Sequence, residues 1–232
     1  MSDELTAEEE IALLRAENLA LIADREDALQ RARELDRALI SMKHKLDKAR
    51  VDFLTKLPTR VVFEERIRDE IVACRRDGTC MTVLIVDLGE LGLVNTAFDH
   101  GPGGDLMLLR LAKILRDSLR GSDTVARWSD GGEDTLARWG GDEFGVILHD
   151  AGMAEARVVV ARIQRVVENA LVRVGVGEGT MIPLKAAIGV AVGCGNQLSE
   201  GIKDVADAAL GRAKKARKSS GAYFAAVFGD MP

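Results

Sequence analysis

The sequence predicts an α/β domain with a mixed central sheet flanked by helices, preceded by a long N-terminal helix that forms a coiled coil. The first observation is that residues 8–53 contain no glycine or proline and are rich in helix-forming residues. The second is that short apolar runs alternate with amphipathic segments from residue 54 onward. The third is a hairpin pattern near the middle of the chain. We therefore expect a coiled-coil helix at 1–53 and a globular domain at 54–232.

The N-terminal segment carries a heptad repeat. When Ile11 is position a, the a and d positions are mostly apolar: Ile11, Leu14, Asn18, Leu21, Arg25, Ala28, Ala32, Leu35, Leu39, Met42, Leu46 and Ala49. Asparagine at an a position, here Asn18, fixes the register of a coiled coil, whereas the stretch from Arg25 to Ala32 makes a weak centre. We expect the helix to join two chains into a homodimer and to offer a surface for a protein partner. The alternative is one amphipathic helix packed on its own domain.

The chain after residue 54 alternates between two patterns. Helical periodicity covers 60–76, 104–119, 154–171 and 202–218, and short apolar runs indicate buried strands at 81–88, 184–193 and 222–228. The runs TLARW (135–139) and FGVILH (144–149) flank Gly140-Gly141 and predict a β-hairpin. Because helices and strands alternate around one hairpin, we expect an α/β sandwich with a mixed sheet.

The composition, with 47% hydrophobic and 30% charged residues, is that of an ordinary soluble protein. No stretch approaches the roughly 18 apolar residues of a membrane span, and the acidic N-terminus is unlike a signal peptide. Cys74, Cys80 and Cys194 are odd in number and lack metal-ligand spacing, so we expect reduced thiols in a cytoplasmic protein. The net charge of −5 argues against a general nucleic-acid binder.

Acidic residues mark a candidate site for a cation. Asp87 ends the apolar strand, and Asp142 and Glu143 directly follow Gly140 and Gly141 at the hairpin tip. Glycines allow a close approach of the backbone to a ligand, and Mg²⁺ prefers one or two protein carboxylates together with phosphate oxygens. Asp87 and Asp142 would supply these carboxylates if their strands are neighbours. The alternative is an ordinary turn with solvated acids.

The end of the last predicted helix is basic. Its cationic side chains are Arg212, Lys214, Lys215, Arg217 and Lys218. A triphosphate bound near the acids requires such cations. The alternative is a solvated C-terminal turn whose cations interact with the helix dipole.

These residues lie in segments that resemble one family. RWGGDEF (138–144) resembles the signature of the GGDEF domains, the bacterial diguanylate cyclases. DFLTKLPTR (52–60) is similar to the family motif D-x-L-T-G-L-P-N-R, and VDLGELGLVNTAFDHGPGGD (86–105) to D-x-D-x-F-K-x-x-N-D-x-x-G-H-x-x-G-D. AIGVAV (187–192) and ADAALGRAKKARK (206–218) resemble S-I-G-V-A and A-D-x-A-L-Y-x-A-K-x-x-G-R. The resemblance covers residues 52–228 and implies the palm-like fold of nucleotide cyclases.

The resemblance implies condensation of two GTP into cyclic di-GMP with release of two pyrophosphates, one GTP coming from each subunit of a dimer. It assigns two Mg²⁺, or Mn²⁺ in their place, to Asp87, Asp142 and the Leu88 carbonyl. It places Gly140 and Gly141 under the phosphates and Glu143 near the reacting centre. It assigns the guanine to Asn95 and Asp105, and phosphates to Lys214 and to Lys218, which stands at the family's arginine.

The sequence also departs from the family pattern. Gly89 replaces the second aspartate of D-x-D, Gly92 a lysine and Gly211 a tyrosine, and Arg217-Lys218 replaces Gly-Arg. One residue is inserted after His100, which moves the guanine-reading acid to Asp105. These departures leave an alternative function, a catalytically degenerate module that binds GTP or cyclic di-GMP as a receptor or adaptor.

A short repeat precedes the signature. DTVARW (123–128) recurs as DTLARW (134–139), and the second copy leads into the glycine turn, so we expect it to be the working one. The resemblance implies a product-binding R-x-x-D site, here Arg120 and Asp123, through which cyclic di-GMP inhibits. Either the inserted residues follow this site and leave it able to bind product, which we favour, or they displace Arg120 and inhibition is lost.

Overall fold

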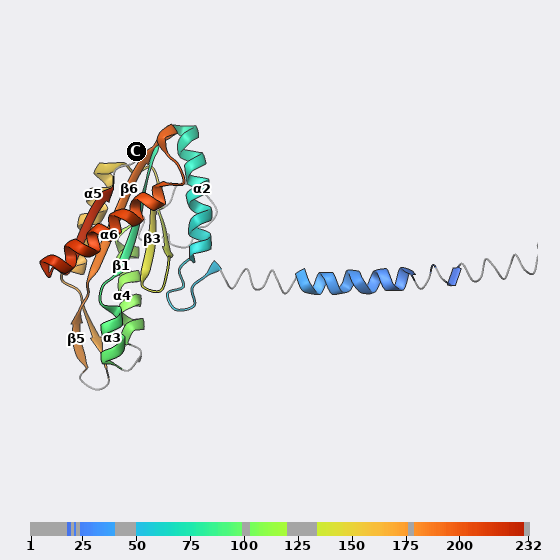
Figure 1. Cartoon of the computed structure of the whole chain (residues 1–232), viewed down its shortest axis with the longest axis horizontal. Helices are drawn as coiled ribbons and strands as arrows, with labels where there is room; N and C mark the ends of the chain where they lie inside the picture. The colour runs from blue at the N-terminus through green and yellow to red at the C-terminus, as the bar shows by residue number, and fades with distance from the viewer. Residues whose placement is uncertain are drawn as a thin grey trace, which may run out of the picture. The chain divides into compact units, whose positions relative to one another are not determined.

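The structure, a computed structural model, describes residues 18–19, 21, 24–39, 50–98, 103–119, 134–175 and 179–229 (Figure 1). Its contacts divide the chain into two compact units, Met1–Lys48 and Ala49–Pro232. At the start of the second unit, an isolated antiparallel bridge joins Val51 to Pro58.

The N-terminal unit contains a described helix at residues 24–39. The described part covers 16 residues of the predicted 8–53, and the heptad positions on either side fall largely outside the described residues. Leu21, Leu35 and Leu39, which occupy the predicted seam, are 60–65% exposed. These three described seam positions are therefore exposed, and the pairing of the helix into a coiled coil stays a prediction.

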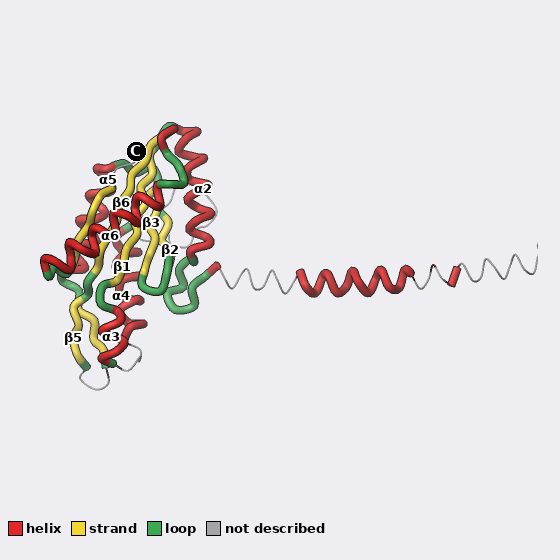
Figure 2. Tube along the Cα trace, in the orientation of Figure 1, coloured by secondary structure: helices red, strands yellow, loops and turns green. Residues whose placement is uncertain are grey.

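The second unit is built on a five-stranded sheet with the order β2-β3-β1-β6-β7 (Figure 2). The strands are β1 (Cys80–Leu88), β2 (Thr135–Arg138), β3 (Glu143–Leu148), β6 (Ala186–Cys194) and β7 (Phe224–Gly229). β6 and β7 are parallel, whereas the other neighbours are antiparallel. The predicted mixed sheet is therefore confirmed, with β1 at its centre.

Helices cover both faces of this sheet. They are α2 (Arg60–Asp77), α4 (Gly103–Ser118), α5 (Met153–Val167) and α6 (Ile202–Ser220). Alternate residues of β1 face opposite sides: Leu84 and Val86 pack in the cluster that includes α4 and α5, and Val83 and Ile85 in the cluster with α2 and α6. By the same alternation, Asp87 lies on the face that α6 covers (Figure 1).

A glycine in β6 allows α6 to lie directly on the sheet. A Cβ atom at Gly189 would lie 2.0 Å from the Ala206 carbonyl oxygen and 2.2 Å from the Leu210 amide nitrogen. Only glycine fits this close approach of two backbones. This packing fixes the path of α6, and its C-terminal half then passes the end of β1.

Four elements were not predicted from the sequence. They are α3 (Leu91–Ala97), the short 3-10 helix η1 (Gly195–Gln197), and the strands β4 (Leu171–Val174) and β5 (Thr180–Pro183), which form a separate hairpin. The predicted helix at 154–171 ends earlier, at Val167, because the next apolar residues alternate between buried and exposed as in a strand. The sequence LGLVNTA of α3 contains few strong helix formers, so its tertiary packing through buried Val94 supports it.

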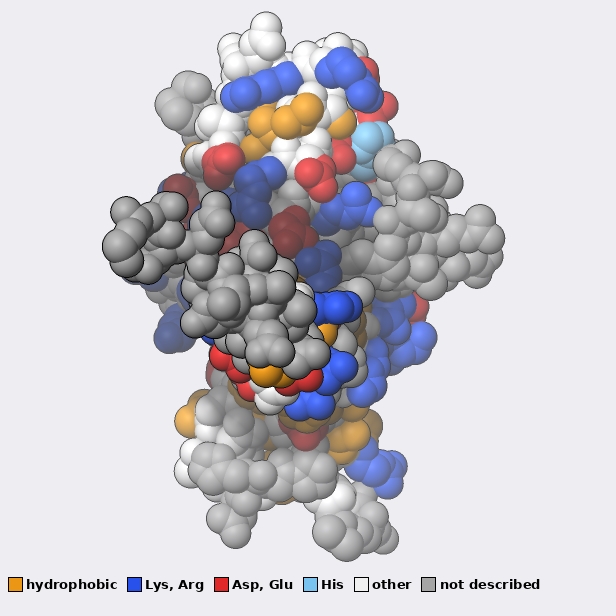
Figure 3. All heavy atoms as spheres, turned by 90° about the vertical axis from the view of Figure 1, so that its right-hand side faces the viewer, with side chains coloured by type: hydrophobic (Ala, Val, Ile, Leu, Met, Phe, Trp, Pro, Cys, Tyr) orange, Lys and Arg blue, Asp and Glu red, His pale blue; other side chains and the backbone are white. Residues whose placement is uncertain are grey.

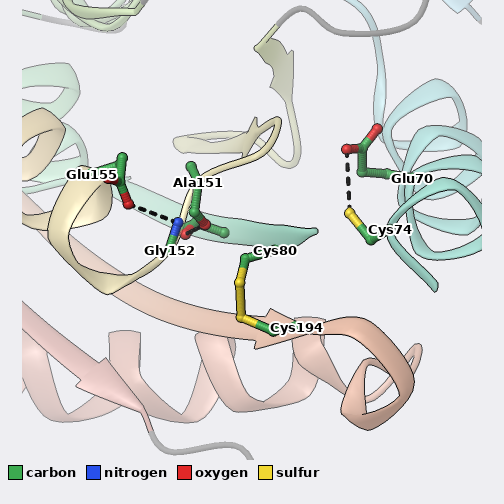
Figure 4. Close-up of a disulfide and its surroundings, with 8 residues drawn as sticks. Glu70, Cys74, Cys80, Ala151, Gly152, Glu155 and Cys194 are labelled. Atoms are coloured by element: carbon green, nitrogen blue, oxygen red, sulfur yellow. Dashed lines mark hydrogen bonds between the residues drawn. A yellow bond between two sulfur atoms is a disulfide. The ribbon is translucent and has the colours of Figure 1, made fainter. Parts of the chain in front are cut away.

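The cysteines correct one prediction. Cys80 and Cys194, expected as reduced thiols, form a disulfide between β1 and β6 (Figure 4). They occupy opposite positions that form a non-hydrogen-bonded pair, the arrangement in which Cα atoms of antiparallel strands come closest, and here their Cα atoms are 4.0 Å apart. The spacing did not reveal the pair because 114 residues separate the partners and only the sheet register brings them together.

The remaining cysteine, Cys74, is free and buried on α2. Burial raises the pKa of its thiol, and the nearby Glu70 carboxylate acts in the same direction. The thiol donates a hydrogen bond to Glu70 Oε1 at 3.6 Å (Figure 4). This cysteine therefore stays protonated and packs as a small apolar side chain.

Candidate active site

Three acidic residues meet where β1 ends and β3 begins. The two strands are antiparallel neighbours, and Asp87 lies opposite Glu143 in their register. The Leu88 amide donates a hydrogen bond of 2.9 Å to the Asp142 carbonyl oxygen, which ties the hairpin tip to the end of β1. The sequence-based expectation that these strands are neighbours is thus confirmed, and it places Asp142 beside Asp87.

Lys214 of α6 brings a positive charge to the same place. Its Nζ lies 2.7 Å from Asp87 Oδ2 and 3.0 Å from Glu143 Oε1. The ammonium group therefore links the acid at the end of β1 to the acid at the start of β3. Of the predicted site residues, Asp87, Glu143 and Lys214 are in direct contact.

The electrostatics of this cluster follow from burial and charge. Burial raises the pKa of Asp87, and the neighbouring Asp142 and Glu143 raise it further, while Lys214 acts in the opposite direction. Burial tends to lower the pKa of Lys214, yet the contacts with Asp87 and Glu143 raise it overall. The ammonium stays charged, and the acids lie in an arrangement that a cation stabilises.

The residues fit a divalent cation. Asp87 and Asp142, with the Leu88 carbonyl, are hard oxygen donors of the kind that Mg²⁺ takes from a protein when phosphate oxygens complete its shell. A cationic group already lies against Asp87 in the form of Lys214. Within the described ranges, no group of three or more His, Cys, Asp or Glu side chains is gathered as a complete metal cage.

The hairpin tip is held from outside by Arg138. Its Nη1 lies 3.0 Å from Asp52 Oδ2, and its Nη2 donates a 2.6 Å hydrogen bond to the Gly141 carbonyl oxygen. Burial would raise the pKa of Asp52, but hydrogen bonds from Thr55 and the Arg138 guanidinium lower it below the usual value. Sequence reasoning missed this support, although Asp52 and Arg138 both stand inside the quoted motifs.

The glycines of the tip leave open space. Among the described residues other than its chain neighbours, a Cβ atom at Gly141 would meet no atom within 4 Å, and one at Gly140 would meet only the Glu143 side chain, at 3.5 Å or more. Packing against the described residues therefore does not require glycine at Gly141. The open space is consistent with a ligand that approaches the backbone closely, and the role of the two glycines stays a prediction.

Asn95 lies against the start of α4. A Cβ atom at Gly104 would lie 2.0 Å from the Asn95 side-chain oxygen, so the absence of a side chain at Gly104 lets Asn95 approach. Asp105, the next residue, is exposed in the first turn of the helix. The structure thus brings Asn95 and the segment that carries Asp105 together despite the residue inserted after His100.

The basic residues of α6 divide into two groups. Arg212, Lys215 and Lys218 are exposed, whereas the Arg217 side chain is only 4% exposed. Arg217 follows Leu210 and Ala213 at a spacing of three and four residues, which places it on the buried face of the helix. That spacing is a sequence signal that would have separated Arg217 from its exposed neighbours.

Two predicted site residues cannot be placed. Arg120 and Asp123, the expected product-binding pair, lie outside the described residues, as does the first copy of the repeat. The second copy leads into β2 and the hairpin, as expected.

Opposite charges lie next to each other along α2. Arg60 pairs with Glu64 at 2.9 Å, and Arg76 pairs with Asp77 at 2.8 Å. In Figure 3, acidic and basic side chains are both present among those drawn in colour. No helix in the described part of the chain is long and apolar enough to cross a membrane.

Fold and site together define a nucleotide-cyclase-like α/β domain with carboxylates and a lysine at the end of its central strand pair. The family model described as "Diguanylate cyclase, GGDEF domain" matches residues 49–133 and 130–220. The chain therefore belongs to the GGDEF domain family. The two matched segments meet at 130–133, between the two copies of the repeat, which agrees with an insertion there.

Curated relatives carry the same family name. The chain is 30% identical over 169 residues to the diguanylate cyclase DgcP of Pseudomonas aeruginosa and 32% identical over 165 residues to the diguanylate cyclase DosC of Escherichia coli. These matches cover 73% and 71% of this chain but only 23% and 33% of the relatives. The chain thus spans a third or less of their length.

Solved structures share the fold. Diguanylate cyclase SiaD of Pseudomonas aeruginosa, solved with its activator SiaC, has a TM-score of 0.64 at 27% identity, covering 94% of this chain and 79% of that one. The coiled coil and GGDEF domain of DgcB from Caulobacter crescentus has a TM-score of 0.65 at 18% identity, over 91% of this chain and 99% of that one. The second likeness supports the fold alone.

Proposed function

We propose that this chain is a diguanylate cyclase that condenses two GTP into cyclic di-GMP and two pyrophosphates across a dimer interface. The observation that carries the proposal is the meeting of Asp87, Asp142 and Glu143 with Lys214 at one end of the β1–β3 pair. This site lies within a chain of the GGDEF family. Phosphoryl-type transfer depends mainly on positioning and charge neutralisation, and these are the functions such a cluster performs.

The reaction joins two nucleotides held by two subunits. The 3′-hydroxyl oxygen of one GTP forms a bond to the α-phosphorus of the other, the bond from that phosphorus to the bridging oxygen breaks, and pyrophosphate leaves. The 3′-hydroxyl oxygen of the second GTP attacks the α-phosphorus of the first in the same way, a second pyrophosphate leaves, and the ring is closed. Glu143 lies beside the reacting centre, where its carboxylate is placed to accept the hydroxyl proton. Asp87, Asp142 and the Leu88 carbonyl would hold Mg²⁺ or Mn²⁺, which supplies charge neutralisation when bound.

Lys214 changes partners in this proposal. In the structure its ammonium group contacts Asp87 and Glu143. When the acids take a divalent cation, the side chain is free to turn to the terminal phosphates, where exposed Lys218 joins it. Asn95 and Asp105 then bind the guanine edge, consistent with the close approach of Asn95 to Gly104.

The proposal extends to assembly and regulation. The exposed leucines Leu21, Leu35 and Leu39 support pairing of two N-terminal helices into a homodimer. The same helix is proposed to accept a protein partner, and SiaD, a similar protein over 94% of this chain, was solved with an activator. Cyclic di-GMP is proposed to bind Arg120 and Asp123 as an inhibitor, and the protein is proposed to act in the cytoplasm.

A second candidate is a degenerate module that binds GTP or cyclic di-GMP as a receptor or adaptor. The observation in its favour is the open space at Gly92 and Gly211, where the family pattern has a lysine and a tyrosine. Apart from its chain neighbours and the backbone of its own helix, no heavy atom of the described residues lies within 4 Å of a Cβ atom built at either position. None of the described residues thus takes the place of the two missing side chains.

One experiment separates the two candidates. The purified chain, shown to be dimeric by light scattering, is incubated with GTP and Mg²⁺, and cyclic di-GMP is measured by chromatography. Product from the wild type and none from Glu143→Gln supports the cyclase. Binding of GTP or cyclic di-GMP without turnover by the dimer supports the receptor and contradicts the cyclase.

A further inference from the structure

Gly89 and Arg217 lie directly against each other. A Cβ atom at Gly89 would lie 2.7 Å from Cζ, 2.7 Å from Nη1 and 2.8 Å from Nη2 of Arg217. These three atoms are the end of the guanidinium group. The group therefore fills the volume in which a side chain at position 89 would begin, and the two cannot occupy it together.

Both residues are departures from the family pattern. Gly89 stands at the second aspartate of D-x-D, and Arg217 stands at the glycine of A-K-x-x-G-R. They are far apart in the sequence, and nothing in either motif connects them. In the structure they form one contact between the end of β1 and the last turn of α6. The two departures therefore compensate each other in volume and make this place more positive than the family pattern would.

The guanidinium is poorly neutralised. The Arg217 side chain is 4% exposed, and its Nε is buried without a hydrogen-bond partner among the described residues. Among the described residues, the acid paired with it is Glu90, whose Oε1 lies 3.8 Å from Nη1. Glu90 itself is bound by Lys185, whose Nζ is 2.7 Å from both carboxylate oxygens. A buried charge with such weak pairing costs free energy unless an anion comes close.

The backbone beside this charge is held in place on two more sides. The Leu88 amide donates to the Asp142 carbonyl oxygen at 2.9 Å, and the Gly89 amide donates to the Lys185 carbonyl oxygen at 2.8 Å. The segment 88–90 is thus fixed by the hairpin, by the start of β6 and by Arg217 of α6. It carries the Leu88 carbonyl assigned to the cation site and lies next to Asp87.

We propose that Gly89 and Arg217 act as one unit, in which the guanidinium replaces the missing side chain at 89, positions residues 88–90 and attracts the polyphosphate of a nucleoside triphosphate to that segment. This inference deepens the proposed function and rests on it. Arg217 is a positioning residue. Its permanent positive charge acts on the polyphosphate through residues 88–90, and this attraction does not require a divalent cation. It therefore supports nucleotide binding even before a metal ion is present.

The test is a double-mutant cycle read by nucleotide affinity. The variants are Arg217→Gln, which removes the charge, Gly89→Ala, whose methyl group displaces the guanidinium, and the combination of both. The probe is a non-hydrolysable GTP analogue, titrated by calorimetry in EDTA and again in Mg²⁺. Lys215→Gln is the matched control, because it removes an exposed cation from the same helix.

We expect Arg217→Gln and Gly89→Ala each to weaken binding in EDTA by about tenfold, with little further loss in the double variant because both remove the same interaction. Arg217→Lys, which keeps the charge, should recover binding to within roughly threefold, and Lys215→Gln should change it less than about twofold. Unchanged binding by Arg217→Gln, equal losses in Arg217→Gln and Arg217→Lys, or losses that multiply in the double variant would overturn the proposal.

The outcome is distinct from that for the proposed function. If the wild-type dimer binds the analogue as described but forms no cyclic di-GMP, the proposed cyclase activity is contradicted, whereas the proposal for Gly89 and Arg217 is supported. If the wild type is an active cyclase and its Arg217→Gln variant binds the analogue and turns over GTP equally well, only the proposal for Gly89 and Arg217 is contradicted. Thermal unfolding of each variant is recorded, and a lowered melting temperature with unchanged affinity counts against the proposal.

Discussion

The two ends of β1 are held in opposite ways. At one end Cys80 is joined covalently to Cys194, and its carbonyl accepts a hydrogen bond of 3.0 Å from the Ala151 amide. At the other end Asp87 is held by the ammonium group of Lys214. A covalent bond does not rearrange when a nucleotide arrives, whereas an ion pair can exchange its partners. The central strand thus has one fixed end and one end whose contacts a ligand can change, and the proposed chemistry is assigned to the second.

The largest effect is expected at the exchangeable end. Asp87→Asn should lower cyclic di-GMP formation by about a thousandfold, because it removes a charged oxygen from the cation site. Thermal stability should change little, since burial and neighbouring acids raise the pKa of Asp87 and a neutral side chain relieves this cost. The initial rate of pyrophosphate release measures the effect. Asp204→Asn, an exposed acid on α6, is the control, and a rate above a tenth of wild type would contradict the assignment.

At the fixed end the effect should appear in stability and not in turnover. Cys80→Ser should lower the free energy of unfolding by about 3 kcal/mol without reductant, because the unfolded chain gains freedom. Added dithiothreitol should remove the difference from wild type, and the cyclase rate should stay within about twofold, because the site lies at the other end of the strand. Urea titrations measure the difference. Free thiols at both positions in the oxidised wild type would refute the pairing.

The exchange of partners by Lys214 can be measured without turnover. Lys214→Met should raise the affinity for Mn²⁺ without nucleotide by about tenfold, because the ammonium no longer competes for Asp87 and Glu143. The same variant should bind a GTP analogue in Mg²⁺ about tenfold more weakly, because a phosphate contact is lost. Electron paramagnetic resonance of Mn²⁺ and calorimetry give the two values, with Lys215→Met as control. An unchanged Mn²⁺ affinity would show that no competition exists.

The smallest effect concerns the support of the hairpin. The pKa of Asp52 is lower in the folded chain than its ordinary value of 3.8. The ionised carboxylate therefore stabilises the fold at any pH above 3.8, and this contribution is lost as the pH falls through the lowered pKa. Asp52→Asn should therefore cost about 1 kcal/mol at pH 7 and nothing at low pH. Unfolding in urea across this pH range tests the prediction. A difference that does not depend on pH would exclude the ionised Asp52–Arg138 contact as its cause.

The local sequence pattern was sufficient to predict a helix or strand where the pattern lay within that one element. The apolar run of β1, the periodicity of α2 and the Gly-Gly turn identified their elements, because each reflects the burial of one face or a local turn. The pattern failed at α3 and at the β4–β5 hairpin, which are short and owe their structure to packing. It also misjudged where α5 ends, since an alternating run followed the helix without a break.

The candidate site divides in the same way. Asp87, Asp142, Glu143 and Lys214 were identified from residue type and resemblance, and the structure brings them to one sheet end. Arg138 with Asp52, by contrast, was invisible as a pair, because the two residues lie in different motifs and meet only across the fold.

The sequence by itself determined the order of the main helices and strands, the family and the residue types at the site, because hydrophobic period, turn glycines and motif spacing are local properties. The tertiary structure alone decided the contacts between distant positions. The sheet register paired Cys80 with Cys194, and the close packing of α6 on β6 directed Lys214 to Asp87 and Arg217 to Gly89. Such pairs depend on register and helix placement, and these are set by the packing of the whole core rather than by any single segment.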